Sequence, residues 1–255
     1  SSQGTLNDLD VPKQLWPSLV ADCARLLGAA RVEGGTYRCI FDPEVVGLFA
    51  HEAFGHGTEG DMFTRRRAKG AEYLGKQVAS ELVDLYDSPA LPGHAASFHF
   101  DHEGVLATTT QIIEKGILKR PMTDKITARK LNIVPSANGR RESYARKAYT
   151  RMTNTYFGTG TSSFDELIGG IDHGYWIRHG RNGMEDPKGW GIQCEAYLAE
   201  EIKGGKPTGK VFSPVVITGY VPDMLRSIDG VGDTICINGM GMCGKGYKEW
   251  VKVTD

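Results

Sequence analysis

The segment HEAFGH, residues 51–56, constrains the fold of this chain more than any other feature of its sequence. Two imidazoles beside a carboxylate are typical of zinc peptidases, in which the histidines hold the ion and the glutamate accepts a proton from water. The residues just before this segment predict that it lies on a helix. Asp42 can cap that helix, Pro43 suits its first position, and Glu44 favours its positive end.

The five-residue spacing of His51 and His56 does not fit a regular α-helix. With 3.6 residues per turn, side chains at i and i+4 lie about 40° apart around the axis, whereas those at i and i+5 lie about 140° apart. The two histidines can share one ion if a π-bulge adds a residue to the turn, or if the helix ends early and His56 belongs to the following turn. Gly55 makes either distortion easier because it has no Cβ atom. A metal site therefore predicts a local irregularity in the helix.

A catalytic zinc site needs a third protein ligand and leaves its fourth position to water or substrate. Cys243 is one candidate, because the glycines around it would let its thiolate reach an ion. Other candidates are a cluster of acidic residues and histidines and a later pair of glutamates, namely His99, Asp101, His102, Glu103, Glu200 and Glu201. The residues alone leave these alternatives open.

The rest of the chain predicts a strand-rich α+β fold with a few helices and the metal motif on one of them. Glycine is frequent, with 33 of 255 residues, and aromatic and β-branched residues are spread throughout. Besides the motif helix, helices are predicted over 12–30, 124–131, 164–171 and 222–228. Strands are predicted over 36–41, 81–86, 108–114, 117–122, 175–178, 190–202 and 209–212. The segment 132–150 is predicted to be an irregular, mobile loop.

Charge and cysteine content narrow the classes of function. Thirty basic residues balance 31 acidic ones, so nothing indicates nucleic acid or an anionic membrane as a partner. The five cysteines are an odd number without a C-x-x-C pair, which argues against a disulfide framework and favours a reducing compartment. We see no signal peptide and no apolar stretch of about 20 residues. These features predict a cytoplasmic protein.

The chain resembles the TldD/PmbA family of metallopeptidases, specifically its zinc-binding, TldD-like branch. The matching segments follow the family's order and cover nearly all of residues 40–245. They are HEAFGHGTEGD (51–61), LPG (91–93), DHEG (101–104), IIEKGILK (112–119), DKITARKL (124–131), RMTNTY (151–156), EAYLAEEIKGGK (195–206) and MCGK (242–245).

The resemblance implies a zinc ion held by His51, His56 and Cys243, with Glu52 as the general base. It also implies hydrolysis of small or unstructured peptides. The residue that would share stabilisation of the oxyanion with the metal is not identified by the sequence. Candidates for it are Tyr156, His102 and Arg129.

The resemblance further implies a cytoplasmic protein that forms a homodimer or a heterodimer with a family paralogue. Family members usually carry an extra N-terminal domain, and from the resemblance we expect most of it to be missing from this chain. We therefore expect residues 1–255 to form a single catalytic domain of the C-terminal type, with residues 1–34 as an N-terminal helical remnant.

Three other functions remain as alternatives. A peptidase of the dipeptidyl-peptidase-III type shares the H-E-x-x-x-H spacing and would take its third ligand from Glu200 or Glu201. A catalytically inactive regulatory or scaffold subunit of a peptidase pair would keep the fold only, although the intact Glu52 argues against it. A cupin-like metal oxidase would bind iron through His99, Asp101 and His102.

Overall fold

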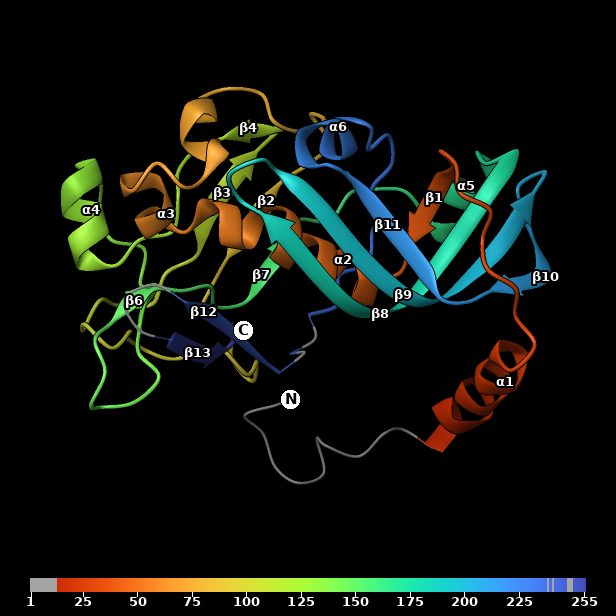
Figure 1. Ribbon diagram of the computed structural model, residues 1–255, viewed down its shortest axis with the longest axis horizontal. Coiled ribbons are helices and arrows are strands. Elements are labelled where there is room, and N and C mark those ends of the chain that lie inside the picture. The colour runs from red at the N-terminus through yellow and green to blue at the C-terminus, as the bar shows by residue number, and fades with distance from the viewer. Residues whose placement is uncertain (1–12, 238, 240, 247–249) are drawn as a thin grey trace.

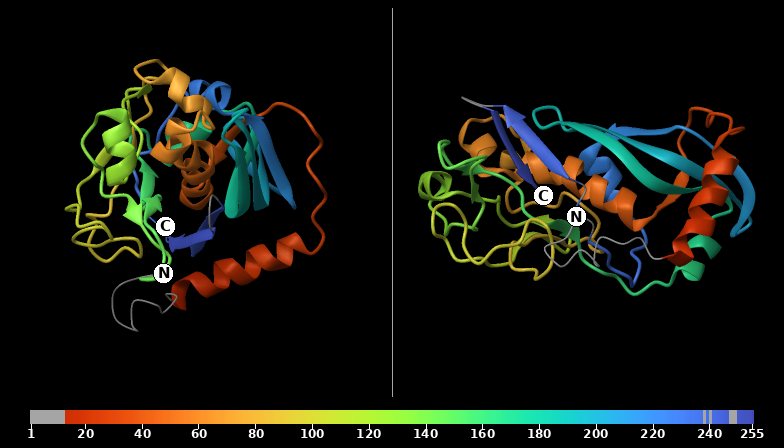
Figure 2. Two further views of the ribbon diagram at one scale, coloured as in Figure 1. Left: turned by 60° about the vertical axis from the view of Figure 1, so that its left-hand side comes forward. Right: turned by 90° about the horizontal axis from the view of Figure 1, so that it is seen from below.

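A helical segment that runs between two β-sheets organises the molecule. The computed structural model of the protein describes residues 13–237, 239, 241–246 and 250–255. The helix α2 (Pro43–Ala50) contacts a strand of each sheet, and the left-hand view of Figure 2 shows it between them. Asp42 caps α2 by accepting a hydrogen bond of 2.8 Å from the backbone N–H of Val45. The predicted start of this helix is therefore confirmed.

The larger sheet is built on one long hairpin. Its strands are β1 (Arg38–Phe41), β8 (His173–Asp186), β9 (Gly191–Lys203), β10 (Lys206–Phe212) and β11 (Val215–Tyr220). β8 and β9 form the hairpin, which crosses the front of the molecule in Figure 1. β1 lies parallel to the first part of β8, while β10 and β11 pair antiparallel with different parts of β9. A register shift between Gly180 and Asn182 places a bulge in β8.

The smaller sheet lies on the other side of α2. Its strands, in spatial order, are β4 (Ile117–Leu118), β3 (Thr110–Glu114), β2 (Leu85–Asp87) and β7 (Thr155–Phe157). β3 and β4 form the predicted hairpin, whose turn residues Lys115 and Gly116 both have positive φ. Two further two-stranded sheets combine β5 (Gly139–Arg140) with β6 (Tyr149–Thr150), and β12 (Met242–Gly246) with β13 (Trp250–Thr254).

Short helices surround these sheets. They are α1 (Trp16–Leu26), α3 (Gly60–Thr64), α4 (Lys125–Leu131), α5 (Phe164–Gly169) and α6 (Val221–Arg226), with 3₁₀ turns at Lys13–Leu15 and Lys69–Tyr73. Asp124 and Ser163 begin α4 and α5 with capping boxes, which explains why local sequence predicted both helices. No residue of α1 is buried, and this helix is held to the larger sheet by ion pairs from Asp22 and Arg25. Within the described residues, no helix has both the length and the apolar character that crossing a membrane requires.

The main hydrophobic core fills the space between the helix and the two sheets. It contains Phe49, Ala53 and Phe54 from the helical segment, Ile112, Ile113 and Leu118 from the smaller sheet, and Trp190 and Ile192 from the hairpin end of the larger sheet. Burying one such large side chain stabilises the fold by about 1.5–3 kcal/mol relative to leaving it exposed. The helix is therefore held firmly from both sides, which positions the side chains that follow it.

The mixed, strand-rich α+β class is confirmed, but several boundaries differ from the prediction. The strand predicted over 175–178 continues to Asp186, because pairing with β9 supports a polar stretch that has little strand signal of its own. The strand predicted over 81–86 begins only at Leu85. The segment 132–150 is not wholly irregular, since it contains β5 and β6 with the buried Arg140. Residues 1–12 lie outside the described residues.

Candidate metal centre

The helix becomes irregular where the two histidines lie. α2 passes without a break into a π-helical turn over His51–Gly55, and a 3₁₀ turn follows over His56–Thr58. The backbone N–H of His56 donates to the carbonyl oxygen of His51, which is the i to i+5 bond of a π-helix. The extra residue turns both imidazoles to one face. Gly55 allows close packing here, because a Cβ atom at this position would overlap the sulfur of the buried Met152 and force that side chain to move.

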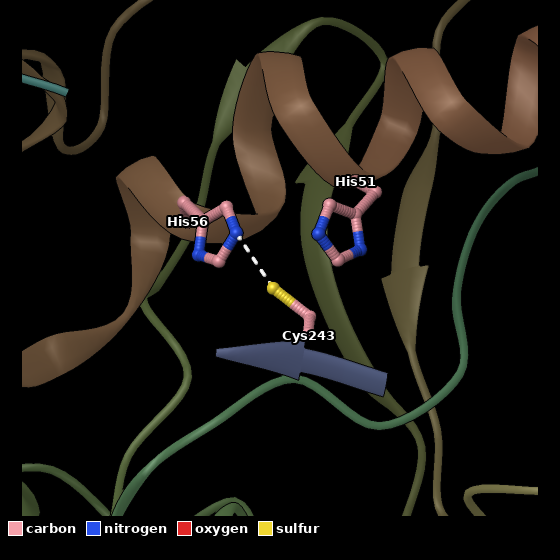
Figure 3. A group of neighbouring side chains, drawn as sticks. All are labelled: His51, His56 and Cys243. Atoms are coloured by element: carbon pink, nitrogen blue, oxygen red, sulfur yellow. Dashed lines mark hydrogen bonds between the residues drawn. The ribbon is translucent and has the colours of Figure 1, made fainter. Parts of the chain in front are cut away.

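A cysteine from the far end of the chain meets the two histidines. Figure 3 shows Cys243 on β12 with its sulfur directed toward the imidazoles of His51 and His56. The Sγ atom lies 3.2 Å from Nε2 of His56, and one possible ligand atom from each of the three residues lies within 4.8 Å of the others. The structure thus brings together the three predicted ligands, all of which are half-buried.

The donor set suits zinc in its chemistry, and the distance between two of its ligand atoms is near that of a tetrahedral site. Imidazole and thiolate are common zinc ligands, at about 2.0–2.1 Å and 2.3 Å from the ion. In a tetrahedral site, such ligand atoms are about 3.5 Å apart. The 3.2 Å between Cys243 and His56 is close to this value, so a small adjustment would accommodate an ion.

The other candidate ligands lie elsewhere. Asp101 accepts hydrogen bonds from the backbone N–H groups of Glu103, Val105 and Gly139, so its carboxylate organises a turn. Glu200 forms ion pairs with two arginines of α1 and β8, and Glu201 with a lysine of its own strand. None of these contacts reaches His51 or His56. Of the three candidates for oxyanion stabilisation, Tyr156 lines the cleft beside the motif, whereas His102 and Arg129 do not.

Glu52 is buried between the helix and β8. Its Oε1 lies 3.8 Å from Nε2 of His51, and a Cβ atom at Gly183 on β8 would overlap its side chain. β8 therefore needs a glycine at this point for the carboxylate to fit. Burial raises the pKa of Glu52 above its ordinary value of 4.5, while the charge on His56 acts in the opposite direction. This shift brings the pKa of Glu52 closer to neutral pH, which suits a general base.

The two imidazoles have opposite shifts. Burial, the charge of His56 and then that of Arg151 lower the pKa of His51 to about 3, so this ring is neutral. Burial also acts to lower the pKa of His56, but hydrogen bonds and charges from Cys243 and Glu59 outweigh it and raise this pKa to about 10. The site therefore pairs one neutral ring with one that readily holds a positive charge facing the sulfur.

Sequence reasoning missed a second carboxyl group near the motif. Both oxygens of Glu185 on β8 are buried and have no hydrogen-bond partner among the described residues. Burial, followed by the charges of Glu52, Glu59 and Asp186, raises the pKa of Glu185 well above 4.5, although His56 opposes the shift. A lone glutamate in a polar stretch carries no sequence signal for such burial.

The raised pKa of Glu185 predicts a pH-dependent stability. The carboxyl group of Glu185 binds its proton more tightly in the folded protein than in the unfolded chain. Its contribution to the free energy of unfolding is therefore fully present below about pH 4.5 and is lost as the pH rises toward the pKa of the folded state. Glu185→Gln is neutral at every pH and should lack this loss. We expect the melting temperature of Glu185→Gln to exceed that of the parent by a few degrees at pH 8 and to approach it near pH 4. A constant difference across this range, or the same trend in the exposed control Glu142→Gln, would contradict the prediction.

A large cleft opens beside the motif. It has a volume of about 1810 Å³ and is lined by His51, Glu52 and Cys243, by residues 153–158 around β7, and by residues 214–218 of β11. Sites for drug-sized ligands have volumes of about 300–1,000 Å³, so this cleft can hold a larger, extended ligand.

Comparison with known proteins matches the chain to one family. The model of the PmbA/TldA metallopeptidase C-terminal domain matches residues 34–250. A metalloprotease of Methanothermobacter thermautotrophicus is 36% identical over 87% of this chain and 48% of its own length. A metalloprotease TldD homologue of Buchnera aphidicola is 35% identical, over 86% of this chain and 45% of its own. A zinc metalloprotease TldD homologue of Saccharolobus solfataricus is 30% identical over 97% of this chain and 52% of its own length. The chain spans about half the length of these relatives.

Solved structures share the fold. TldE from Thermococcus kodakarensis superposes with a TM-score of 0.71 at 21% identity, covering 94% of this chain and 53% of its own. A Thermotoga maritima protein described as a candidate modulator of a DNA gyrase superposes with a TM-score of 0.79 at 24% identity. The superposition covers 92% of this chain and 53% of that protein. The two sheets around a central helix are therefore a shared architecture.

Proposed function

Because the chain belongs to the PmbA/TldD family of metallopeptidases, we propose that it is a zinc-dependent peptidase whose metal ligands are His51, His56 and Cys243. The observation that carries this proposal is the convergence of the three ligand atoms within 4.8 Å, next to the buried carboxylate of Glu52. Hydrolysis of an unstructured peptide by the zinc-loaded protein tests it. A loaded protein that leaves such peptides intact would contradict it.

In this proposal Glu52 is the general base. A bound zinc ion supplies Lewis acidity, which makes water a stronger acid and polarises the scissile carbonyl group. Glu52 accepts the proton of the attacking water and passes it to the leaving amine. Burial supports this role in two ways, because it raises the pKa of Glu52 and because the close approach of Gly183 restricts the positions its side chain can take.

We propose that the substrate is an extended peptide that binds as an added strand. β7 lines the cleft next to the motif, and within the described part of the chain it pairs with β2 on one side only. A peptide in the cleft could therefore form main-chain hydrogen bonds with the free edge of β7, which would give weak sequence preference. We expect a peptide bound to the Glu52→Gln variant to show strand-like pairing with residues 155–157. A complex without such pairing would overturn this mode of binding.

We further propose that the protein is cytoplasmic and forms a homodimer, or a heterodimer with a family paralogue. Among the described residues, no cysteine takes part in a disulfide bond, which suits a reducing compartment. The sequence is similar to that of TldD homologues and the fold to that of a TldE protein, so a pair of related chains is a reasonable assembly. Sedimentation of the purified chain, alone and mixed with a paralogue, distinguishes the two assemblies.

A further inference from the structure

A buried cluster of charged side chains lies behind the three proposed ligands. Its members are Glu59, Arg151, Lys245 and Asp255. The side chains of Glu59 and Arg151 have no exposed surface at all. Charged groups are costly to bury unless they are well paired, so a cluster of this kind calls for an explanation.

Glu59 lies on the Nδ1 side of His56. Its Oε2 is 3.6 Å from Nδ1 of His56 and 2.9 Å from Nζ of Lys245, and its Oε1 is 3.2 Å from Nη1 of Arg151. The Nε2 atom of the same imidazole faces the sulfur of Cys243. The carboxylate and the proposed ion would therefore be on opposite sides of one ring.

Arg151 connects Glu59 to the other two proposed ligands. Its Nη2 lies 3.6 Å from Oδ2 of Asp255, an atom that is itself 3.9 Å from Nδ1 of His51. Its guanidinium also interacts with the sulfur of Cys243. One connected set of charges thus contacts both histidines and interacts electrostatically with the cysteine.

Stability alone does not account for this arrangement. Neither oxygen of Glu59 and none of the three guanidinium nitrogens of Arg151 has a partner in good hydrogen-bond geometry among the described residues. Loosely aligned buried ion pairs are often no more stabilising than apolar side chains of similar size. The network is better explained by what it does to the ligands.

We propose that Glu59 is a positioning residue for the metal site, which holds the Nδ1–H of His56 so that Nε2 is presented to the ion. Carboxylates that accept a hydrogen bond from a metal-bound histidine fix its tautomer and its orientation. Arg151 and Lys245 hold Glu59 in place from the opposite side. This inference rests on the zinc site proposed above.

Two variants of Glu59 test the inference through zinc affinity, measured by competition with a chromophoric chelator. Glu59→Gln removes the negative charge but keeps the shape of the side chain. Glu59→Asp keeps the charge that Arg151 and Lys245 need, but its shorter side chain places the carboxylate farther from His56. We expect both variants to bind zinc about 10–100-fold more weakly than the parent. We also expect the absorption spectrum of the cobalt-substituted protein to change, which reports the ligand geometry independently of activity.

Asp61→Asn is the matched control. Asp61 is also buried and lies 2.8 Å from Nζ of Lys245, but it has no direct contact with either histidine. This variant should lower the melting temperature and leave zinc affinity and the cobalt spectrum unchanged. Parent-like zinc affinity in both Glu59 variants, or an equal loss in Asp61→Asn, would overturn the positioning role while the zinc site stands. A parent that binds no zinc would overturn the zinc site itself, and the inference with it.

Discussion

Glu52→Gln is expected to lower kcat for peptide hydrolysis by about 10²–10⁴-fold while the protein keeps its zinc. The amide has nearly the shape of the carboxylate, so it fits beside Gly183 and leaves His51 and His56 undisturbed. It cannot accept the proton of the attacking water, because an amide has no basic oxygen at neutral pH. The loss should therefore appear in kcat and in kcat/KM together, as for an interaction made only in the transition state.

Single-turnover assays and metal analysis on the same samples measure the two halves of this prediction. Glu44→Gln is a suitable control, because Glu44 is on the same helix but its side chain is 45% exposed and it contacts His179 rather than the histidines of the motif. This control should keep parent-like activity. If Glu52→Gln cleaves peptides as fast as the parent, Glu52 is not the base. If Glu52→Gln loses its zinc, the missing metal explains its loss of activity, and the result does not identify Glu52 as the proton acceptor.

His56→Ala and Cys243→Ala are each expected to abolish stoichiometric zinc binding. A catalytic zinc ion has three protein ligands, and two ligands hold it far less tightly than three. The parent should contain about one zinc per chain, whereas both variants should contain little after dialysis against a weak chelator. The bound zinc should also raise the melting temperature of the parent, because a ligand that binds only the native state stabilises it, and this increase should disappear in both variants.

Elemental mass spectrometry checks this result, with Cys23→Ala as the control. Cys23 is an exposed free cysteine on α1, so its replacement should leave the zinc content unchanged. If Cys243→Ala keeps its full zinc content, another residue must supply the third ligand, which would contradict the ligand set proposed here. A parent without metal, even after zinc is added, would favour a catalytically inactive subunit of a peptidase pair.

Much of the neighbourhood of His51 and His56 could be predicted from short-range sequence. The cap at Asp42, the proline at 43 and the apolar run that follows are local signals, and they place the helix correctly. The irregularity at His51–Gly55 also follows from local geometry, because a spacing of five residues cannot share one face of a regular α-helix. The hairpin at Lys115 and the capping boxes of α4 and α5 are local in the same sense.

The choice among the candidate third ligands could not be made from the residues alone. Cys243 is 187 residues from His56 along the chain, and the spacing of residues within a segment does not show which distant segment it will meet. The resemblance to a known family pointed to Cys243, while His102, Glu200 and similar candidates were equally possible from their chemistry. The structure shows those groups in contacts of their own and places the cysteine beside the imidazoles.

What the sequence by itself determined was therefore the helix, the need for an irregularity at its two histidines and the residue types that make a metal site possible. Only the tertiary structure decided which charges surround that site. Glu59 meets Arg151 and Lys245, and the carboxyl oxygens of Glu185 are buried without a hydrogen-bond partner among the described residues, because segments far apart in the chain pack against the motif. Burial and the pairing of charges are properties of the packed molecule, since both depend on which surfaces exclude water, and no local pattern of residues specifies that.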